Sequence, residues 1–260
     1  MIGDDVAVDD LRVANLPELA GQRALVALLD RTFRAGAADQ VLAVDVVRAL
    51  AHAGNYVAGA WRGERLVGGT VAFLGTGHLH SHVTAVDPGT HGRGVGHALK
   101  LHQREWALAR GITDVRWTFD PLVGRNAYFN ITKLGAEPTA YLTDFYGPLT
   151  DGVNAGDETD RLYVRWDLTA SRRAAEAEPA AAVPVLGRSA DDRPLSTVPP
   201  PGGSPALVAT PTDIEALRGR DPDAARAWRL AVRAALTTLL ADGYRVTGFR
   251  RDGFYILEAR

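Results

Sequence analysis

The 260-residue sequence contains no cysteine. This absence excludes a disulfide framework, a zinc site built on thiolates and a cysteine nucleophile. Long apolar runs are also missing, because no stretch approaches the roughly 18–20 residues that a membrane helix needs. The first ten residues are acidic, whereas a secretory signal begins with positive charge and continues with an apolar core. We therefore expect a cytoplasmic protein without a membrane segment.

Charge of one sign does not dominate either. The chain has 29 lysines and arginines against 31 aspartates and glutamates, which leaves a formal net charge of -2. A general nucleic-acid binder needs a basic face that displaces counterions from phosphates, and a membrane-surface protein needs a polybasic segment. The composition disfavours both kinds of partner. The hydrophobic content of 46% suffices for one large domain, or for one domain with a smaller attachment.

Three regions are distinguished by composition and periodicity. Residues 1–169 alternate strand-like and helix-like segments, which predicts a mixed α/β domain. Residues 170–205 are rich in alanine, proline, serine and glycine and predict a linker. Residues 206–260 regain a pattern of short strands around a helix at 222–240. About 55 residues make a marginal core, so we expect this extension to dock onto the first domain or onto a partner subunit, and a homodimer is compatible with the sequence.

The most informative segment runs from His78 to Gly111. A predicted strand ends at Val86, and a loop with three glycines in five residues leads directly into a helix. Glycine lets the backbone approach a bulky ligand closely. The amides and the dipole at the start of a helix attract an anion, so the segment predicts a phosphate or diphosphate site.

Two common phosphate-binding motifs do not fit this loop. A P-loop requires Gly-Lys-Ser/Thr after the glycines, whereas the sequence reads Gly96-His97-Ala98. A dinucleotide fingerprint requires a third glycine, whereas Gly94-Val95-Gly96 is followed by Leu99 at that position.

The segment resembles the GNAT superfamily of acyl-CoA-dependent N-acetyltransferases. The likeness lies in Ala85-Val86-Asp87-Pro88 and in the run from Gly92 to Leu99, while His91 stands where the family has Arg or Gln. It implies an α/β (α+β) GNAT fold: a mixed central sheet with splayed parallel strands, flanked by helices, here with the small C-terminal α/β extension. The resemblance implies that acetyl-CoA, or another acyl-CoA, is bound through these residues: Ala85, Val86, His91, Gly92, Arg93, Gly94, Val95, Gly96, His97 and Asn126. The backbone at Ala85 and Val86 would bond the pantetheine, and an amide near Val86 would polarise the thioester carbonyl.

Further segments are similar to a GNAT subgroup of predicted acetyltransferases. They are Leu79–His82, Trp117–Leu122, Arg125–Asn130 and Lys133–Ala136, and the likeness continues through Trp228-Arg229 and Gly243–Val246. This narrower resemblance does not identify the acceptor.

Histidines supply the first candidates for catalysis. His78, His80 and His82 alternate, so strand geometry places them on one face. An imidazole suits removal of a proton from an ammonium group, and His80 and His82 are equal candidates for the general base. Two alternatives stay open: half-buried structural histidines, and a zinc site, which the lack of a neighbouring carboxylate disfavours.

Other candidates lie in the second half of the domain. The family usually has a tyrosine acid where this chain has Ile131, so we consider Tyr128, with Tyr141 and Tyr146 as further options. Asn126 resembles the asparagine of the family that bonds pantetheine, with helix N-cap as its rival role. Asp120 pairs with Arg125, binds a cationic acceptor, acts as a base or stabilises a turn. Arg229 and Arg233 share a helix face and either anchor a carboxylate or are solvated.

The resulting hypothesis is an enzyme that transfers an acetyl or other short acyl group from acyl-CoA to the primary amine of a small molecule, such as an amino acid. No metal is expected. The alternatives are an acyl-CoA-binding sensor without activity and a metal enzyme based on the histidine strand.

Overall fold

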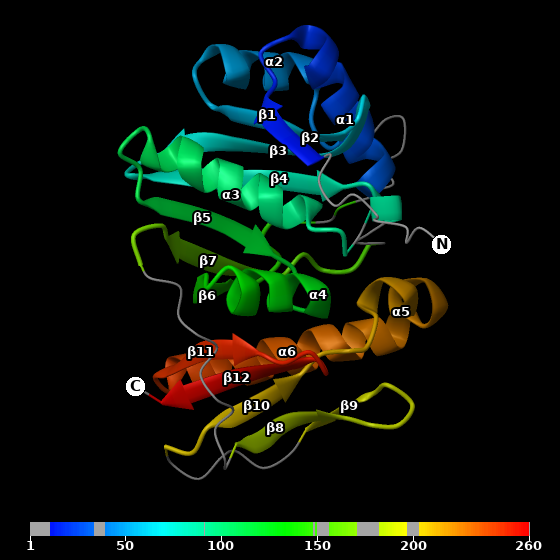
Figure 1. Cartoon of the computed structure of the whole chain (residues 1–260). Coiled ribbons are helices and arrows are strands. Elements are labelled where there is room, and N and C mark those ends of the chain that lie inside the picture. The colour runs from blue at the N-terminus through cyan, green and yellow to red at the C-terminus, as the bar shows by residue number, and fades with distance from the viewer. Residues whose placement is uncertain are drawn as a thin grey trace, which may run out of the picture. The chain divides into compact units, whose positions relative to one another are not determined.

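The computed structural model describes residues 11–33, 40–90, 92–147, 149, 156–170, 182–196 and 203–259. The chain divides into two compact units, residues 1–115 and 116–260. Both units contain strands and helices (Figure 1), which confirms the mixed α/β class expected from the sequence. Among the described residues, no helix is long and apolar enough to cross a membrane.

The first unit is a four-stranded antiparallel arrangement with three helices. Its strands follow one another in the order β1-β2-β3-β4. The elements are β1 (Leu11–Asn15), α1 (Leu19–Phe33), α2 (Val44–His52), β2 (Tyr56–Arg62), β3 (Arg65–Gly75), β4 (His78–Val86), the 3₁₀ turn η1 (Pro88–Thr90) and α3 (Val95–Leu108). Strand β5 (Asp114–Phe119) leads from this unit into the second.

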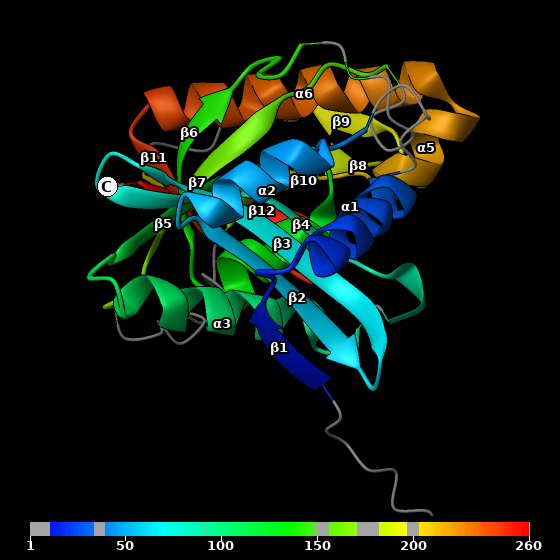
Figure 2. The same ribbon diagram turned by 90° about the horizontal axis from the view of Figure 1, so that it is seen from above.

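Helices cover both faces of the first unit's strands. Helix α3 lies on one face and helix α1 on the other (Figure 2). Two adjacent glycines of β3 show how closely the two helices approach the backbone of this strand. A Cβ atom on Gly68 would lie 2.6 Å from Val95 Cγ1 of α3, and a Cβ atom on Gly69 would collide with Leu25 of α1. Both helices therefore pack against bare backbone, because neither position could hold a side chain without displacing a helix.

The second unit contains two groups of strands. Strands β5, β7 and β6 are neighbours in that order, and the five-stranded sheet has the order β11-β12-β10-β8-β9. Its elements after β5 are α4 (Gly124–Ala127), the π-helical η2 (Tyr128–Lys133), β6 (Glu137–Leu142), β7 (Arg161–Asp167), β8 (Val183–Arg188), β9 (Pro194–Ser196), β10 (Ala206–Ala209), α5 (Ile214–Arg220), α6 (Pro222–Ala241), β11 (Tyr244–Phe249) and β12 (Phe254–Ala259).

The five-stranded sheet corrects part of the expected organisation. Strands β8 and β9 lie inside residues 170–205, where composition predicts a linker. Strand β8 pairs in parallel with β10, so the sheet begins before residue 206. The described part of this segment therefore has strands where proline and serine suggested none, because pairing with β10 supplies the backbone hydrogen bonds.

The C-terminal extension also packs on earlier residues of its own unit. The Tyr255 hydroxyl donates to the carbonyl of Pro121 at 2.7 Å, and the Thr132 hydroxyl donates to the carbonyl of Phe249 at 2.8 Å. These contacts join the extension to residues 121 and 132 of the same unit.

Candidate functional site

The loop between β4 and α3 has the backbone that the sequence predicts for a ligand cradle. Gly92 and Gly94 have φ angles of 79° and 80°, in the left-handed region that strains other residues. Among the described residues, a Cβ atom built on either glycine would meet no atom within 4 Å. These two glycines are therefore required by their left-handed conformation and not by crowding from that part of the chain. His91 lies outside the described residues.

Helix α3 starts immediately after this loop. Gly94 is its N-cap residue, and the first helical hydrogen bond runs from the amide of Ala98 to the carbonyl of Gly94. The first amides of any α-helix lack partners within the helix and attract anions. The Arg62 guanidinium donates to the carbonyl of Arg93 at 3.2 Å, which fastens the exposed loop to β2. The geometry fits a phosphate or diphosphate group.

A turn at Asp87 supports the same loop from the side of β4. The Asp87 carboxylate accepts from the Gly89 amide at 3.0 Å and from the Arg65 guanidinium at 2.7 Å. These two donors hold the pKa of Asp87 below its usual value, the Gly89 amide having the larger effect. Asp87 is thus a structural carboxylate of the loop.

Strand β4 carries the histidines on one face, as predicted. The ring centroids of His78 and His80 are 6.5 Å apart, and those of His80 and His82 are 6.3 Å apart. Phe73 of β3 stacks on His80 at 4.8 Å. The register between β3 and β4 shifts here, because Ala72 pairs with Ser81 and Val71 with Val83. His82 is therefore the extra residue of a β-bulge, a device that re-aims side chains near active sites.

Both candidate bases are neutral at pH 7. Burial, together with the neighbouring His82, His78 and Lys100, lowers the pKa of His80 to about 4. Burial also lowers the pKa of His82. A neutral imidazole can accept a proton, but a strongly lowered pKa weakens it as a base. The geometry distinguishes the two histidines, because His82 and not His80 is the extra residue of the bulge.

The opposite face of β4 holds a buried polar cluster that the sequence analysis did not identify. The Lys100 amine of α3 donates to Ser81 Oγ at 2.9 Å and to Gln103 Oε1 at 3.1 Å, and Gln103 Nε2 donates to Ser81 Oγ at 3.2 Å. Lys100 is only 5% exposed. Burial lowers the pKa of its amine to about 7. A signal was present in the sequence, because Lys100 follows Leu99 and lies three residues before Gln103, on the side of α3 that is buried.

In the second unit, Asp120 lies in a buried ion cluster. Its carboxylate accepts from Arg218 Nη2 at 2.6 Å and from Arg229 Nη1 at 2.9 Å. Both arginines also bind Asp157 at 2.9 Å. Burial alone would raise the pKa of Asp120, but the Arg229 and Arg218 charges outweigh it and hold this pKa well below its usual value. Two guanidinium groups occupy the carboxylate, which favours the structural use of Asp120 over a role as base.

These contacts correct two sequence-based expectations. Arg229 was expected to be solvated or to anchor a ligand, but its side chain is 1% exposed and bound to two aspartates. Arg233 binds Asp160 at 2.7 Å and also Glu158. Arg125, considered as a partner of Asp120, pairs with Glu215. Arg229 and Arg233 of α6 are therefore internal ion-pair partners.

The helix after β5 holds Asn126 and Tyr128. Asn126 is exposed and lies within α4, whose N-cap residue is Val123, so the rival N-cap role of Asn126 is wrong. Tyr128 is half-buried and begins the π-helical η2. The Arg251 guanidinium lies 4.9 Å from the centroid of the Tyr128 ring. Segments of π-helix are frequent at functional sites.

The other tyrosines considered as acids are engaged as well. The Tyr141 hydroxyl donates to Asp160 at 2.6 Å, and burial together with this carboxylate raises the pKa of Tyr141. The Tyr146 hydroxyl lies 3.2 Å from the Thr118 hydroxyl of β5. Tyr146 is 40% exposed, so it is the more accessible of these two tyrosines.

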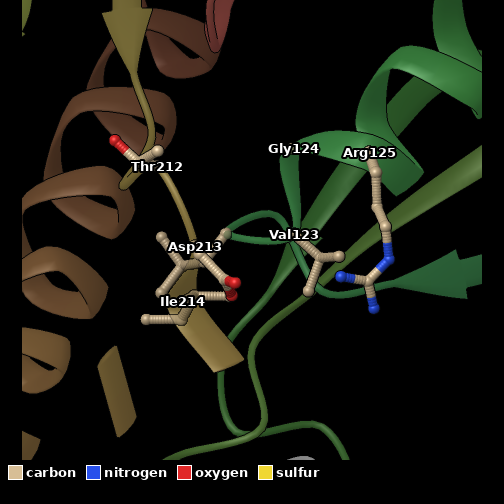
Figure 3. Close-up of a pocket in the computed structure, with 7 residues that line it drawn as sticks. Val123, Gly124, Arg125, Thr212, Asp213 and Ile214 are labelled. Atoms are coloured by element: carbon tan, nitrogen blue, oxygen red, sulfur yellow. The ribbon is translucent and has the colours of Figure 1, made fainter. Parts of the chain in front are cut away.

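A pocket of about 160 Å³ lies elsewhere in the second unit. In Figure 3, Asp213, the N-cap of α5, and Ile214, its first residue, face Val123 from the turn before α4. The Asp213 carboxylate already accepts from the Ala216 amide at 3.1 Å. The volume is below the roughly 300–1,000 Å³ of small-molecule sites, so this pocket is too small for a cofactor.

No group of three or more histidine, aspartate or glutamate side chains among the described residues is arranged to hold a metal ion.

Comparison with known proteins gives one family. Residues 23–135 match the model of the acetyltransferase (GNAT) family. No curated protein matches the sequence of this chain.

Solved structures share the fold at low identity. The ribosomal-protein-S18-alanine N-acetyltransferase of Escherichia coli is 15% identical, with a TM-score of 0.51, over 62% of this chain and 96% of that one. YncA of Salmonella typhimurium, solved with its cofactor acetyl-CoA, is 14% identical, with a TM-score of 0.51, over 65% and 100%. The ribosomal-protein-alanine N-acetyltransferase of Brucella melitensis is 15% identical, with a TM-score of 0.50, over 60% and 99%. The expected GNAT fold is confirmed; the parting of two parallel strands around the cofactor stays a prediction.

Proposed function

We propose that the chain is an acetyl-CoA-dependent acetyltransferase of the GNAT family, whose model residues 23–135 match, and that it acetylates the primary amine of a small molecule, such as an amino acid. The observation that carries this proposal is the loop before α3. Its left-handed Gly92 and Gly94 meet no described residue at their missing Cβ positions and lie at the start of a helix, which supports placing the diphosphate of acetyl-CoA there.

The proposed reaction is direct transfer. The amine nitrogen attacks the acetyl carbonyl carbon, a C–N bond forms, the C–S bond breaks, and coenzyme A leaves as its thiolate. The amine must first lose the proton of its ammonium form, which requires a base at neutral pH. We assign this role to His82, which lies at the bulge of β4 and is neutral at pH 7. Tyr128 is proposed to return a proton to the thiolate.

The backbone of β4 is proposed to hold the pantetheine. Ala85 and Val86 end the strand just before the Asp87 turn, so their peptide groups lead directly into the loop. Val95, Gly96 and His97 form the first turn of α3 and would supply amides to the diphosphate. Arg93 is exposed beside them and carries a positive charge suited to phosphate.

The absence of cysteine makes the test simple. A thiol reagent that reports free coenzyme A has no background from the chain itself. Purified protein with acetyl-CoA is assayed against amino acids, polyamines, aminoglycosides and an alanine-terminated peptide. Thiol release with a small amine, together with an acetylated product in the mass spectrum, supports the proposal. Release with the peptide alone would move the acceptor to proteins, and tight binding of acetyl-CoA without release would indicate a sensor.

Donor choice and location belong to the same proposal. Succinyl-CoA in a parallel assay separates an acetyltransferase from an enzyme for longer or charged acyl groups. A cytoplasmic site of action is proposed, and cell fractionation tests it.

A further inference from the structure

The turn after β5 is held from three elements of the C-terminal extension. Asp120 is bound by Arg218 of α5 and by Arg229 of α6, and the Pro121 carbonyl accepts from the Tyr255 hydroxyl of β12 at 2.7 Å. Within the turn, the Asp120 carboxylate also accepts from the Leu122 amide at 2.9 Å. The same carboxylate therefore shapes the turn and ties it to the extension.

The far end of the helix that follows is held by the extension too. The Thr132 hydroxyl of η2 donates to the Phe249 carbonyl at 2.8 Å and accepts from the Phe249 amide at 3.2 Å. At the start of α4, a Cβ atom on Gly124 would lie 3.4 Å from both Phe249 Cζ and Thr210 Oγ1. The continuous segment of α4 and η2 is thus fixed at both ends by β10, β11 and their neighbours.

The buried ion cluster around Asp120 favours a single position of the turn after β5. The Asp120, Asp157, Arg218 and Arg229 side chains are 9%, 10%, 2% and 1% exposed, with two charges of each sign. Removing one member of such a buried cluster leaves an uncompensated charge, which is strongly unfavourable. Each guanidinium binds both carboxylates, so displacement of the turn would break several charge-assisted bonds at once. The cluster resists any other position of the turn.

We propose that the C-terminal extension, residues 206–260, is a positioning platform for α4 and η2, and that Arg218, Arg229, Tyr255 and Phe249 are positioning residues for acetyl-CoA binding. The inference rests on the proposed function, because α4 carries Asn126, the predicted contact to pantetheine. Arg251 of the extension, which lies over the Tyr128 ring, belongs to the same platform. The extension then sets the position of the α4–η2 segment within its own unit.

The test uses matched variants of the full chain. Thr132→Val keeps the shape but deletes both bonds to Phe249, whereas Thr132→Ser keeps the hydroxyl and should restore them. Tyr255→Phe deletes only the bond to Pro121. Leu236→Ala is the stability control: it opens a cavity in α6, seven residues or roughly 10 Å beyond Arg229, without removing a bond to the turn.

The readouts are the Kd of acetyl-CoA, the thermal midpoint and amide hydrogen exchange at residues 122–127. We expect Thr132→Val and Tyr255→Phe to raise the Kd roughly fivefold or more and to speed exchange, the loss of one net hydrogen bond being worth about that factor. Thr132→Ser and Leu236→Ala should keep the wild-type Kd, although Leu236→Ala lowers the midpoint. Wild-type Kd and exchange in both test variants would overturn the inference. If wild-type protein does not bind acetyl-CoA, the proposed function fails instead, and the exchange rates alone decide the platform.

Discussion

Replacement of Lys100 by methionine should change the pH dependence of stability. The Lys100 amine is buried between α3 and β4, and burial lowers its pKa from 10.5 to about 7. The unfolded chain, in which the amine is hydrated, keeps the ordinary value. Between pH 7 and 10.5 the unfolded state therefore binds more protons than the folded state, and the free energy of unfolding rises with pH across this window.

The magnitude follows from the gap between the two pKa values. A gap of about 3.5 corresponds to ~5 kcal/mol at 1.36 kcal/mol for each pKa unit. This is the stability that wild-type protein gains from pH 7 to 10.5 and loses again as the pH falls through that window. Methionine carries no charge to desolvate, but it also deletes the bonds to Ser81 and Gln103, worth roughly 1 kcal/mol each. We therefore expect Lys100→Met to be more stable at pH 7 by ~2 kcal/mol or more, with a flatter pH profile.

Two assays check this reasoning. Urea unfolding at pH 7, 8 and 9 gives the slope for the wild-type protein and for the variant. The sequence provides a matched control, because Lys133, the other lysine, is exposed, and Lys133→Met should leave the slope unchanged. Labelled lysine gives two sets of NMR signals, one for each residue. A Lys100 signal that titrates above pH 10, or an unchanged slope in Lys100→Met, would refute the argument.

Other expectations concern the site and the extension. Gly94→Val should weaken acetyl-CoA binding at least roughly tenfold in a calorimetric titration, because the left-handed backbone strains a branched residue; Gly77→Val, with a similar φ in the hairpin before β4, is the control and should bind normally. His82→Ala should lower turnover mainly at low pH, where the amine is protonated and needs a base, and a pH–rate profile identical to wild type in this variant and in His80→Ala would remove both histidines. Deletion of residues 206–260 should expose apolar surface and cause aggregation in light scattering, and a soluble, fully active truncated protein would contradict this.

The local part of the site was predictable from the sequence. The glycine spacing after Val86 and the strand–loop–helix order define the cradle through neighbouring residues alone. Alternation likewise places His80 and His82 on one face of β4, which the ring contacts confirm. The β-bulge at His82 was not predictable, because it depends on the register against β3.

Contacts between residues far apart in sequence were missed. Arg229 reaches Asp120 across 109 positions and Asp157 across 72, and no local pattern marks such pairs. A helix in which arginines are interspersed with alanines predicts solvated arginine side chains, because their distant acidic partners leave no mark in the local sequence. Strands β8 and β9 were missed for a related reason, since their pairing with distant β10 and with each other outweighs their composition. The π-helical η2 has no sequence signature comparable to a helix cap.

Gly68 has a consequence that reaches beyond its own strand. The residue nearest to its missing side chain is Val95, the first residue of α3 and the direct neighbour of Gly94. The distance between α3 and the sheet therefore depends on the lack of a side chain at Gly68 of β3. A single methyl group there would displace the start of α3, and with it the amides that are proposed to bind the diphosphate. A substitution at Gly68, in the strand that packs under α3, is accordingly expected to change the affinity for the cofactor.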